Sequence, residues 1–182
     1  IRMRLVGSEM CIRDRGIIGQ LVCRLAEAQG SEVIGIDPDT KRTDLSANFY
    51  TSVEEANMTN VDSVIITAAT SSNEPIEVAT KIARNKAKIV VVGDIPLNIS
   101  RNDFYYKELE LVVSKSYGPG RYDKQYEILG KDYPIEYVRW TENRNFEAFI
   151  KLLSQNQIHL LDLVTKEVSF DNAPSILSLI HI

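Results

Sequence analysis

Short apolar runs recur between Gly16 and about Ser116, and each is bounded by polar residues. Several end in an acidic residue, serine or threonine, which is typical of strands buried in a parallel sheet. The predicted strands cover residues 32–37, 62–70, 87–94 and 109–116. The segment 44–59 is less regular. It predicts a short helix, a short edge strand and another short helix.

Between these runs the apolar residues recur every three or four positions, which predicts helices over 16–30 and 71–85. Gly30 would end the first helix, and Ser72 or Asn73 would cap the second. Strands that alternate with helices indicate an α/β fold, a Rossmann-type doubly wound parallel sheet with helices on both faces. The apolar face of the first predicted helix consists of Ile17, Ile18, Leu21, Val22 and Leu25.

The pattern changes after Ser116. Residues 117–140 are rich in Gly, Pro and Tyr and have weak periodicity, so they predict a long ordered loop. Residues 141–157 predict a helix capped by Thr141. Residues 160–170 predict a strand that pairs with something outside the sheet. The apolar stripe of the helix consists of Phe146, Phe149, Ile150 and Leu153.

Composition excludes several classes of protein. Among 182 residues, 44% are hydrophobic and the formal net charge is −4, so no broad basic field points to nucleic acid or an anionic membrane surface. No apolar run approaches the roughly 20 residues that span a bilayer. Two cysteines exclude a disulfide framework and indicate a reducing compartment. We expect a cytoplasmic protein.

The two ends do not continue the pattern. "VGSEMCIRDR" near the start and "LSLIHI" at the finish resemble translated sequencing-adapter read-through at the ends of assembled open reading frames. We therefore expect residues 1–15 and 177–182 to be artefact. We expect residues 16–140 to form the nucleotide-binding domain, and residues 141–176 to lead by a helix and a return strand toward a missing catalytic domain.

The start of the first predicted helix carries part of a dinucleotide-binding motif. In G-x-G-x-x-G, Gly16 and Gly19 fill the second and third glycine positions. Gly16 would let the backbone approach a pyrophosphate, and Gly19 would let the helix pack closely on the sheet. The amides of Ile17 and Ile18 open the helix, where unpaired donors favour phosphate.

An acid follows at the expected place. Asp37 ends the next strand, where its carboxylate can accept hydrogen bonds from ribose hydroxyls and would repel a 2′-phosphate. This predicts binding of NAD rather than NADP, although Arg42 nearby weakens the exclusion of NADP. The first glycine of the motif is replaced by Asp14, which would crowd and repel a pyrophosphate. Residues 10–13 ("MCIR") then stand where the first strand is expected.

The strings "SVIITAATSSNEPIEVATKIARNKAKIVVVGDI" and "ELELVVSKSYGPGRYD" resemble the medium-chain, zinc-type alcohol dehydrogenases. With "DYPIEYVRWTENRN", the resemblance is strongest to two-domain oxidoreductases fused to a glucose-fructose-oxidoreductase-like half. It covers Gly16 to about Ile176. It implies a parent enzyme that transfers hydride between a nicotinamide dinucleotide and a hydroxyl-bearing, sugar-like substrate.

The resemblance also implies site residues. Ala68 and Ala69 would line the nicotinamide side, and the backbone of Gly93 and Asp94 would meet the carboxamide. Arg121 would reach the pyrophosphate with its planar guanidinium, or else be a solvated loop arginine. Tyr117 and Tyr122 would face the reacting end, or else pack over the edge of a core.

No catalytic residue or metal ligand is assigned. Cys23 lies on an apolar helix as a small core residue, and His159 has no partner at ligand spacing. The resemblance places the zinc ligands in the missing domain, so the chain alone would bind NAD weakly and turn nothing over. The alternative is a non-catalytic NAD-sensing Rossmann module. A methyltransferase built on the same sheet fits the long loop less well.

Overall fold

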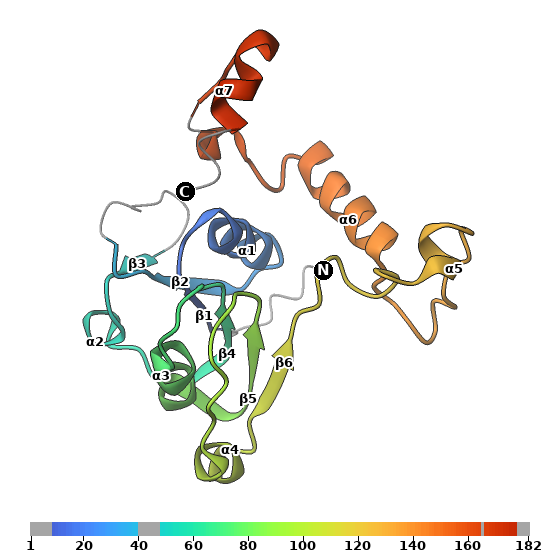
Figure 1. Cartoon of the computed structure of the whole chain (residues 1–182). Helices are drawn as coiled ribbons and strands as arrows, with labels where there is room; N and C mark the ends of the chain where they lie inside the picture. Colours follow the sequence, from blue (N-terminus) through green and yellow to red (C-terminus); the bar gives the residue numbers. More distant parts are fainter. Residues whose placement is uncertain (1–8, 40–47, 165, 178–182) are drawn as a thin grey trace.

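The computed structural model of the chain describes residues 9–39, 48–164 and 166–177. In this part of the chain, six parallel strands form one sheet in the order β3-β2-β1-β4-β5-β6 (Figure 1). This order confirms the predicted α/β class with Rossmann topology. The strands are β1 (Glu9–Arg13), β2 (Glu32–Ile36), β3 (Asn48–Tyr50), β4 (Val61–Ile66), β5 (Ala83–Val91) and β6 (Glu110–Val113).

The central strand β1 comes from the segment expected to be artefact, in which residues 10–13 stand where the first strand is expected. It pairs with β2 from Glu9 to Arg13 and with β4 from Met10 to Arg13. Cys11 and Ile12 are fully buried on opposite faces of the sheet. Residues 10–13 therefore occupy the first-strand position in the structure.

Helix α1 (Ile17–Ala28) covers one face of the sheet beside β1 and β2. Three of its four buried residues are small, namely Gly19, Cys23 and Ala26, and the fourth is Arg24. The small residues let the helix lie close to the strands. The predicted apolar face is wrong at its start, because Ile17 and Ile18 are more than half exposed. Gly30 follows the helix with φ +91 and its amide bonds to Glu27, as expected of a glycine stop.

Three helices cover the other face, namely α2 (Val53–Ala56), α3 (Glu74–Ile82) and α4 (Arg101–Lys107). Ile76, Ala79 and Ile82 of α3 pack with strand residues in the main core. Asn73 is the N-cap residue of α3, and the neighbouring Ser72 hydroxyl accepts a hydrogen bond from the amide of Glu74.

The α3–β5 boundary differs from the predicted one. The sequence predicts a helix to residue 85 and a strand from residue 87, but α3 ends at Ile82 and β5 begins at Ala83. Ala83 pairs with Val61, and the register then shifts before Lys88 pairs with Ser63. Lys86 lies at this irregularity with φ +61, so the strand starts early and contains a kink.

Strand β3 and helix α2 agree with the edge strand and second short helix predicted in the segment 44–59. The first of the two short helices lies outside the described residues. Helix α4 was not predicted. Its C-cap residue is Glu108, with φ +51, and the amide of Leu109 donates a hydrogen bond to the carbonyl of Phe104.

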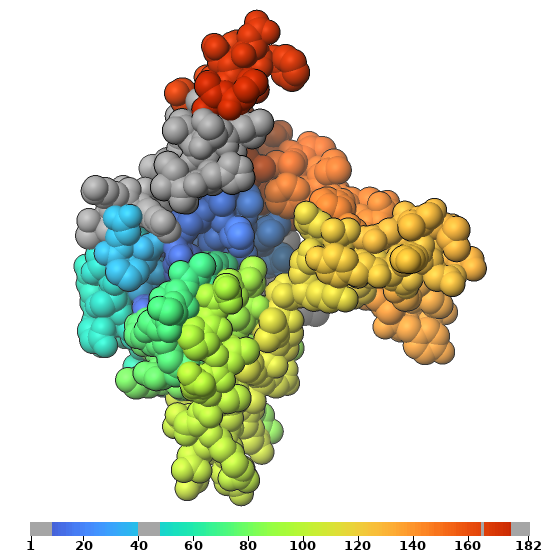
Figure 2. All heavy atoms as spheres, in the orientation of Figure 1, coloured from blue at the N-terminus to red at the C-terminus, as the bar shows by residue number. Residues whose placement is uncertain are grey.

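Beyond β6 the chain leaves the sheet and forms a separate lobe and a tail (Figures 1 and 2). The lobe contains α5 (Lys124–Glu127) and α6 (Glu142–Ser154), with Thr141 at the predicted cap position. The predicted apolar stripe of α6 is largely open to solvent, since Phe146 is 49% and Ile150 61% exposed.

The strand predicted over 160–170 is wrong for the described residues of that range. Short 3-10 turns, η1 (Leu161–Leu163) and η2 (Phe170–Asn172), lie there, followed by α7 (Ala173–Leu177). Leu161 and Phe170 are almost fully exposed. The tail meets the body at α1, where Arg24 donates to the His159 carbonyl and pairs with Asp162 at 2.5 Å. Among the described helices, none has both the length and the apolar character to cross a bilayer.

Candidate functional site at the carboxyl edge of the sheet

Main-chain hydrogen bonds connect the strand ends at the carboxyl edge of the sheet. The amide of Asp14 donates to Ile36, and the amide of Thr67 donates to Arg13, both at 2.9 Å. The amide of Val92 donates to Ile66 at 2.8 Å. In open α/β sheets, ligands bind at this edge where the strand order reverses, which here is between β1 and β4.

The loop between β1 and α1 ends at Gly16, where the helix begins. Gly16 is the N-cap residue of α1, and its carbonyl accepts the first helical bond from Gln20 at 3.0 Å. Ile17 and Ile18 follow as the first helical residues, where amides have no acceptor within the helix. Their side chains are exposed, so the helix N-terminus is open to a ligand.

Asp14 occupies the first glycine position of this loop. Its φ of +69 lies in the left-handed region that glycine adopts without strain. Its carboxylate accepts a hydrogen bond from the Gly16 amide at 3.0 Å. A negative charge of the chain itself therefore lies at the donors that would meet a pyrophosphate.

Gly19 makes the close approach predicted for the third glycine. A Cβ on this residue would lie 2.1 Å from the Asp14 carbonyl oxygen and 2.9 Å from Thr67 Oγ1. Thr67 Oγ1 in turn lies within 2.6 Å of the Asp14 carbonyl oxygen. The residue at position 19 thus has to be glycine for α1 to start beside the ends of β1 and β4.

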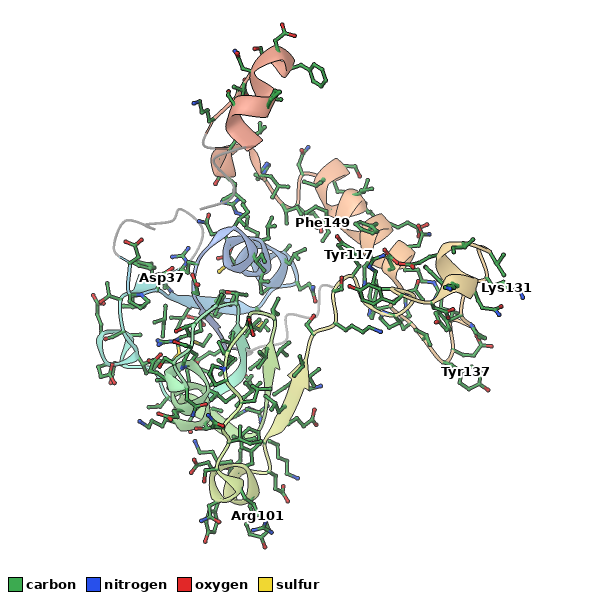
Figure 3. All side chains as sticks on the ribbon, in the orientation of Figure 1. Asp37, Arg101, Tyr117, Lys131, Tyr137 and Phe149 are labelled. Atoms are coloured by element: carbon green, nitrogen blue, oxygen red, sulfur yellow. The ribbon has the colours of Figure 1, made fainter. Side chains whose placement is uncertain are left out.

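Asp37 lies at the end of β2 and holds the same loop. Its carboxylate accepts hydrogen bonds from the amides of Arg15 and Asp39, each at 2.8 Å. The residue is only 3% exposed, and Figure 3 shows it beside α1 near the β2–β3 edge. This arrangement brings the predicted ribose acid and the predicted phosphate loop together. Arg42, the predicted neighbour, lies outside the described residues.

The ends of β4 and β5, which carry the residues predicted to flank a nicotinamide, lie against each other. The amide of Thr70 donates to the Asp94 carbonyl at 2.9 Å. A Cβ on Gly93 would lie 1.9 Å from the Ala68 carbonyl oxygen, so this contact requires glycine. Ala68 is buried, whereas Ala69 and the Asp94 side chain are exposed.

Two buried arginines, Arg13 and Arg15, flank the loop, and neither was assigned a role from the sequence. Arg13 ends β1 and pairs with Glu74, in the first turn of α3. Arg15 is fully buried, with its guanidinium carbon 5.0 Å from the centre of the Phe49 ring and its side chain against Gly35. The sequence feature that could have identified Arg13 and Arg15 is that they are charged residues directly at the end of a short apolar run.

Arg121 lies after β6, as the sequence indicates, in the lobe that contains α5 and α6. Its Nη1 atom pairs with Glu127 at 2.5 Å, and its guanidinium carbon lies 4.4 Å from the centre of the Tyr122 ring. The hydrogen bond to Glu127 raises the pKa of Arg121 above its ordinary value. Tyr117, also in the lobe, packs on Phe146 with ring centres 5.7 Å apart.

In the part of the chain that is described, histidine, cysteine and carboxylate side chains form no group able to hold a metal ion. Cys23 is fully buried in the second core cluster, which confirms the prediction of a core residue. His159 is exposed beside the tail contact with Arg24.

The parallel sheet with strand order β3-β2-β1-β4-β5-β6, covered by helices on both faces, defines the class of fold, a Rossmann-type α/β domain. Solved dehydrogenases share this fold. A short chain alcohol dehydrogenase of E. coli CFT073, complexed with NADH, matches with a TM-score of 0.68 and 17% identity. The match covers 97% of this chain and 49% of that one.

Two further solved structures give the same result. A chain of Sinorhizobium meliloti 1021 assigned as a zinc-binding dehydrogenase, bound to NADP, matches with a TM-score of 0.67 and 19% identity over 97% of this chain and 50% of that one. The D-arabinose dehydrogenase of Sulfolobus solfataricus matches with a TM-score of 0.63 and 12% identity over 85% and 45%. At these identities the similarity shows the fold, over about half the length of the solved chains.

No protein-family profile matches the chain, and no curated protein matches it by sequence.

Proposed function

We propose that the chain is the NAD-binding domain of a medium-chain-type oxidoreductase. The observation that carries this proposal is the position of the Asp37 carboxylate, which directly follows β2 and lies at the edge of the sheet where α1 begins. A carboxylate at this point accepts hydrogen bonds from the ribose hydroxyls of NAD and repels the 2′-phosphate of NADP. The close approaches at Gly19 and Gly93 hold the start of α1 and the ends of β4 and β5 together at the edge where a dinucleotide would lie.

Each part of the edge has a role in this proposal. Gly16 and the amides of Ile17 and Ile18 would bind the pyrophosphate, and Asp37 would bind the ribose. Ala68, Ala69, Gly93 and Asp94 would surround the nicotinamide. Arg121 would contribute only if its ion pair with Glu127 opened, and Arg42 would adjust the choice between NAD and NADP. Bound nicotinamide supplies the hydride chemistry, and the chain holds it in place.

The parent enzyme in this proposal oxidises or reduces a hydroxyl-bearing, sugar-like substrate. The support is the resemblance of the loop strings to two-domain oxidoreductases with a glucose-fructose-oxidoreductase-like half, and a fold shared with a D-arabinose dehydrogenase. Zinc, if the parent uses it, would be bound outside this chain. The chain by itself would bind NAD weakly and have no turnover.

We further propose that the segment 1–15 is not native to this fold. Three adjacent residues support this: Arg13 and Arg15 bury charge beside the sheet, and Asp14 adopts a glycine conformation. Resequencing the source DNA across the codons of Arg15 and Gly16 tests the idea. A strand followed by G-x-G upstream of Gly16 would support it, and the printed codons would refute it.

A second candidate is a non-catalytic NAD-sensing module. Asp14 favours it, because a carboxylate in the phosphate loop weakens dinucleotide binding without removing the ribose acid. In this case no upstream catalytic domain is needed, and Asp14 is a native part of the loop.

Isothermal titration of the chain with NAD and with NADP tests the dinucleotide proposal. We expect NAD to bind more tightly, and Asp37→Asn to weaken NAD binding by about tenfold, equivalent to about 1.4 kcal/mol. Asp39→Asn, two residues further on and exposed, is the matched control and should leave affinity unchanged. Tighter binding of NADP by the unmodified chain would overturn the role of Asp37.

A further inference from the structure

The lobe formed by residues 117–154, the aromatic lobe, is rigidly cross-linked by side chains. The rings of Tyr126 and Tyr133 stack with centres 5.6 Å apart and planes 19° apart. The Tyr126 hydroxyl donates to Thr141 Oγ1 and accepts from the Asn143 amide, each at 3.0 Å. Thr141 is fully buried, so this tyrosine fixes the start of α6 against the loop.

Arg144 fixes the other side of the aromatic lobe. Its guanidinium donates to the carbonyl oxygens of Val138, at 2.5 Å, and Tyr133, at 2.8 Å, and it pairs with Asp132. The side chain is 15% exposed. Since these contacts span the loop and α6, the surface between them has a defined shape before any ligand arrives.

This surface contains a pocket of about 640 Å³. That volume is within the range of small-molecule sites, roughly 300–1,000 Å³. The pocket is made by α5, the loop after it and the first two turns of α6. Its lining includes Arg121, Tyr126, Asp132, Glu142, Asn143 and Phe146.

The lining combines aromatic surface with groups that bind hydroxyls. Tyr126 and Phe146 supply ring surface, against which the C–H face of a sugar ring can pack. Glu142 can accept two or more hydrogen bonds from hydroxyl groups, and the Asn143 side-chain amide can both donate and accept. In a small-molecule pocket, a small number of polar groups among apolar surface determines the orientation of the ligand.

Charge narrows the class of ligand. Three carboxylates line the pocket, and two of them are in ion pairs, Glu127 with Arg121 and Asp132 with Arg144. Glu142 is therefore the source of the pocket's net negative charge. An anionic ligand such as a sugar phosphate would be repelled. A neutral polyhydroxylated ligand can donate hydrogen bonds from its hydroxyls to these carboxylates without electrostatic repulsion.

We propose that the pocket of the aromatic lobe binds a neutral saccharide, one ring in size, through Glu142, Asn143 and the ring surfaces of Tyr126 and Phe146. The pocket is separate from the dinucleotide edge. Figure 3 shows the aromatic lobe and Asp37 on opposite sides of α1. The inference therefore does not depend on the proposed function, although a sugar site agrees with a sugar-like substrate.

Binding is tested with the full chain by saturation-transfer and ¹H–¹⁵N shift measurements. The probes are glucose, galactose and N-acetylglucosamine, with glucose 6-phosphate and glucuronate as anionic counterparts and choline as a cation. We expect at least one neutral sugar to bind in the millimolar range and to shift the Asn143 and Phe146 amides. The anionic counterparts should bind at least fivefold more weakly.

Two variants show whether the pocket is responsible. Glu142→Gln should weaken sugar binding by about tenfold, whereas Glu136→Gln, an exposed carboxylate in the same lobe that does not line the pocket, should have no effect. Phe146→Ala should also weaken binding, and Ile150→Ala, exposed one turn further along α6, should not. Circular dichroism checks that each variant is folded.

Several outcomes would overturn the proposal. These are binding of choline but no sugar, equal binding of sugars and their anionic counterparts, or sugar binding that survives both Glu142→Gln and Phe146→Ala. Failure to bind any sugar would also overturn it. Titration with NAD in the same samples is a separate readout, so loss of the sugar site and loss of the dinucleotide site are distinguishable.

Discussion

The side-chain carboxylate of Asp14 accepts a hydrogen bond from the backbone amide of Gly16, 3.0 Å away, in the loop that opens α1. A carboxylate at this point satisfies a donor and repels a pyrophosphate. We predict that Asp14→Gly raises NAD affinity roughly tenfold, which corresponds to about 1.4 kcal/mol. Isothermal titration measures this change.

Asp14→Asn separates charge from conformation, because asparagine keeps an acceptor of similar size and tolerates a positive φ. If repulsion is the main effect, Asp14→Asn recovers most of the gain. A glycine variant that binds NAD no better than the unmodified chain would contradict a phosphate site in this loop.

Gly19 and Gly93 should be intolerant of any side chain. A Cβ would lie 2.1 Å from a backbone oxygen at position 19 and 1.9 Å at position 93. We predict that Gly19→Ala and Gly93→Ala each lower the free energy of unfolding by about 3 kcal/mol or more. The Tm should fall by about 10 °C in a thermal melt followed by circular dichroism.

Gly130→Ala is the control for this pair. Gly130 has φ +64 and open space around it, so its alanine variant should lose only about 1 kcal/mol, from backbone strain. Equal losses at all three positions would mean that close packing at the strand ends is not what requires glycine.

The two cysteines should be unreactive toward thiol reagents in the folded chain. Cys11 and Cys23 are fully buried, and burial raises the pKa of the Cys11 thiol to about 12. Since the thiolate is the reactive form, neither residue should react with a disulfide reagent at pH 8 until denaturant is added. Rapid labelling of a native cysteine would contradict the position of β1 or of α1.

The aromatic lobe should weaken in acid. Hydrogen bonds from Tyr133 and Arg121 lower the pKa values of Asp123 and Glu127 below their ordinary 3.8 and 4.5. The stabilisation from these carboxylates is present above the ordinary values and is lost as pH falls through the lowered ones. Tyrosine fluorescence should therefore show the aromatic lobe loosening below about pH 4.

Tyr133→Phe removes the donor to Asp123. It should bring the Asp123 pKa back toward 3.8 in a carbon-13 NMR titration of the carboxylates. Tyr137→Phe, an exposed tyrosine of the same lobe, should leave that pKa unchanged. An Asp123 pKa equal in both variants would refute the contact with Tyr133.

The sequence predicts the sheet well because its strands are buried and flanked by clear turn residues. The runs at β2, β4 and β6 lie where the pattern places them. The early start of β5 was missed because the pairing of Ala83 with Val61 is a tertiary contact, invisible to local periodicity.

The errors in the C-terminal half have a common cause. The apolar residues of 160–170 predict a strand by pattern alone, but a strand needs a partner backbone. In the described residues this segment turns instead, and Phe170 is 91% exposed. The stripe on α6 is helical as predicted, yet Ile150 faces solvent.

Only part of the candidate site could be predicted from the sequence. Gly16, Gly19 and Asp37 follow a known spacing, and the structure brings the acid to the loop. Arg121 was placed by resemblance, and the structure gives it Glu127 as its partner. The pocket of the aromatic lobe could not be predicted, because its lining joins α5 and α6 through side-chain contacts that no spacing rule describes.

The strand ends at the carboxyl edge are joined by amides and carbonyls of the main chain, from Asp14 to Ile36, Thr67 to Arg13 and Val92 to Ile66. Bonds of this kind do not depend on side-chain identity, apart from the glycines that allow close approach. The edge is therefore suited to protein engineering: loops that follow β4 and β5 can be exchanged for those of solved proteins with the same fold while the frame beneath them keeps its geometry.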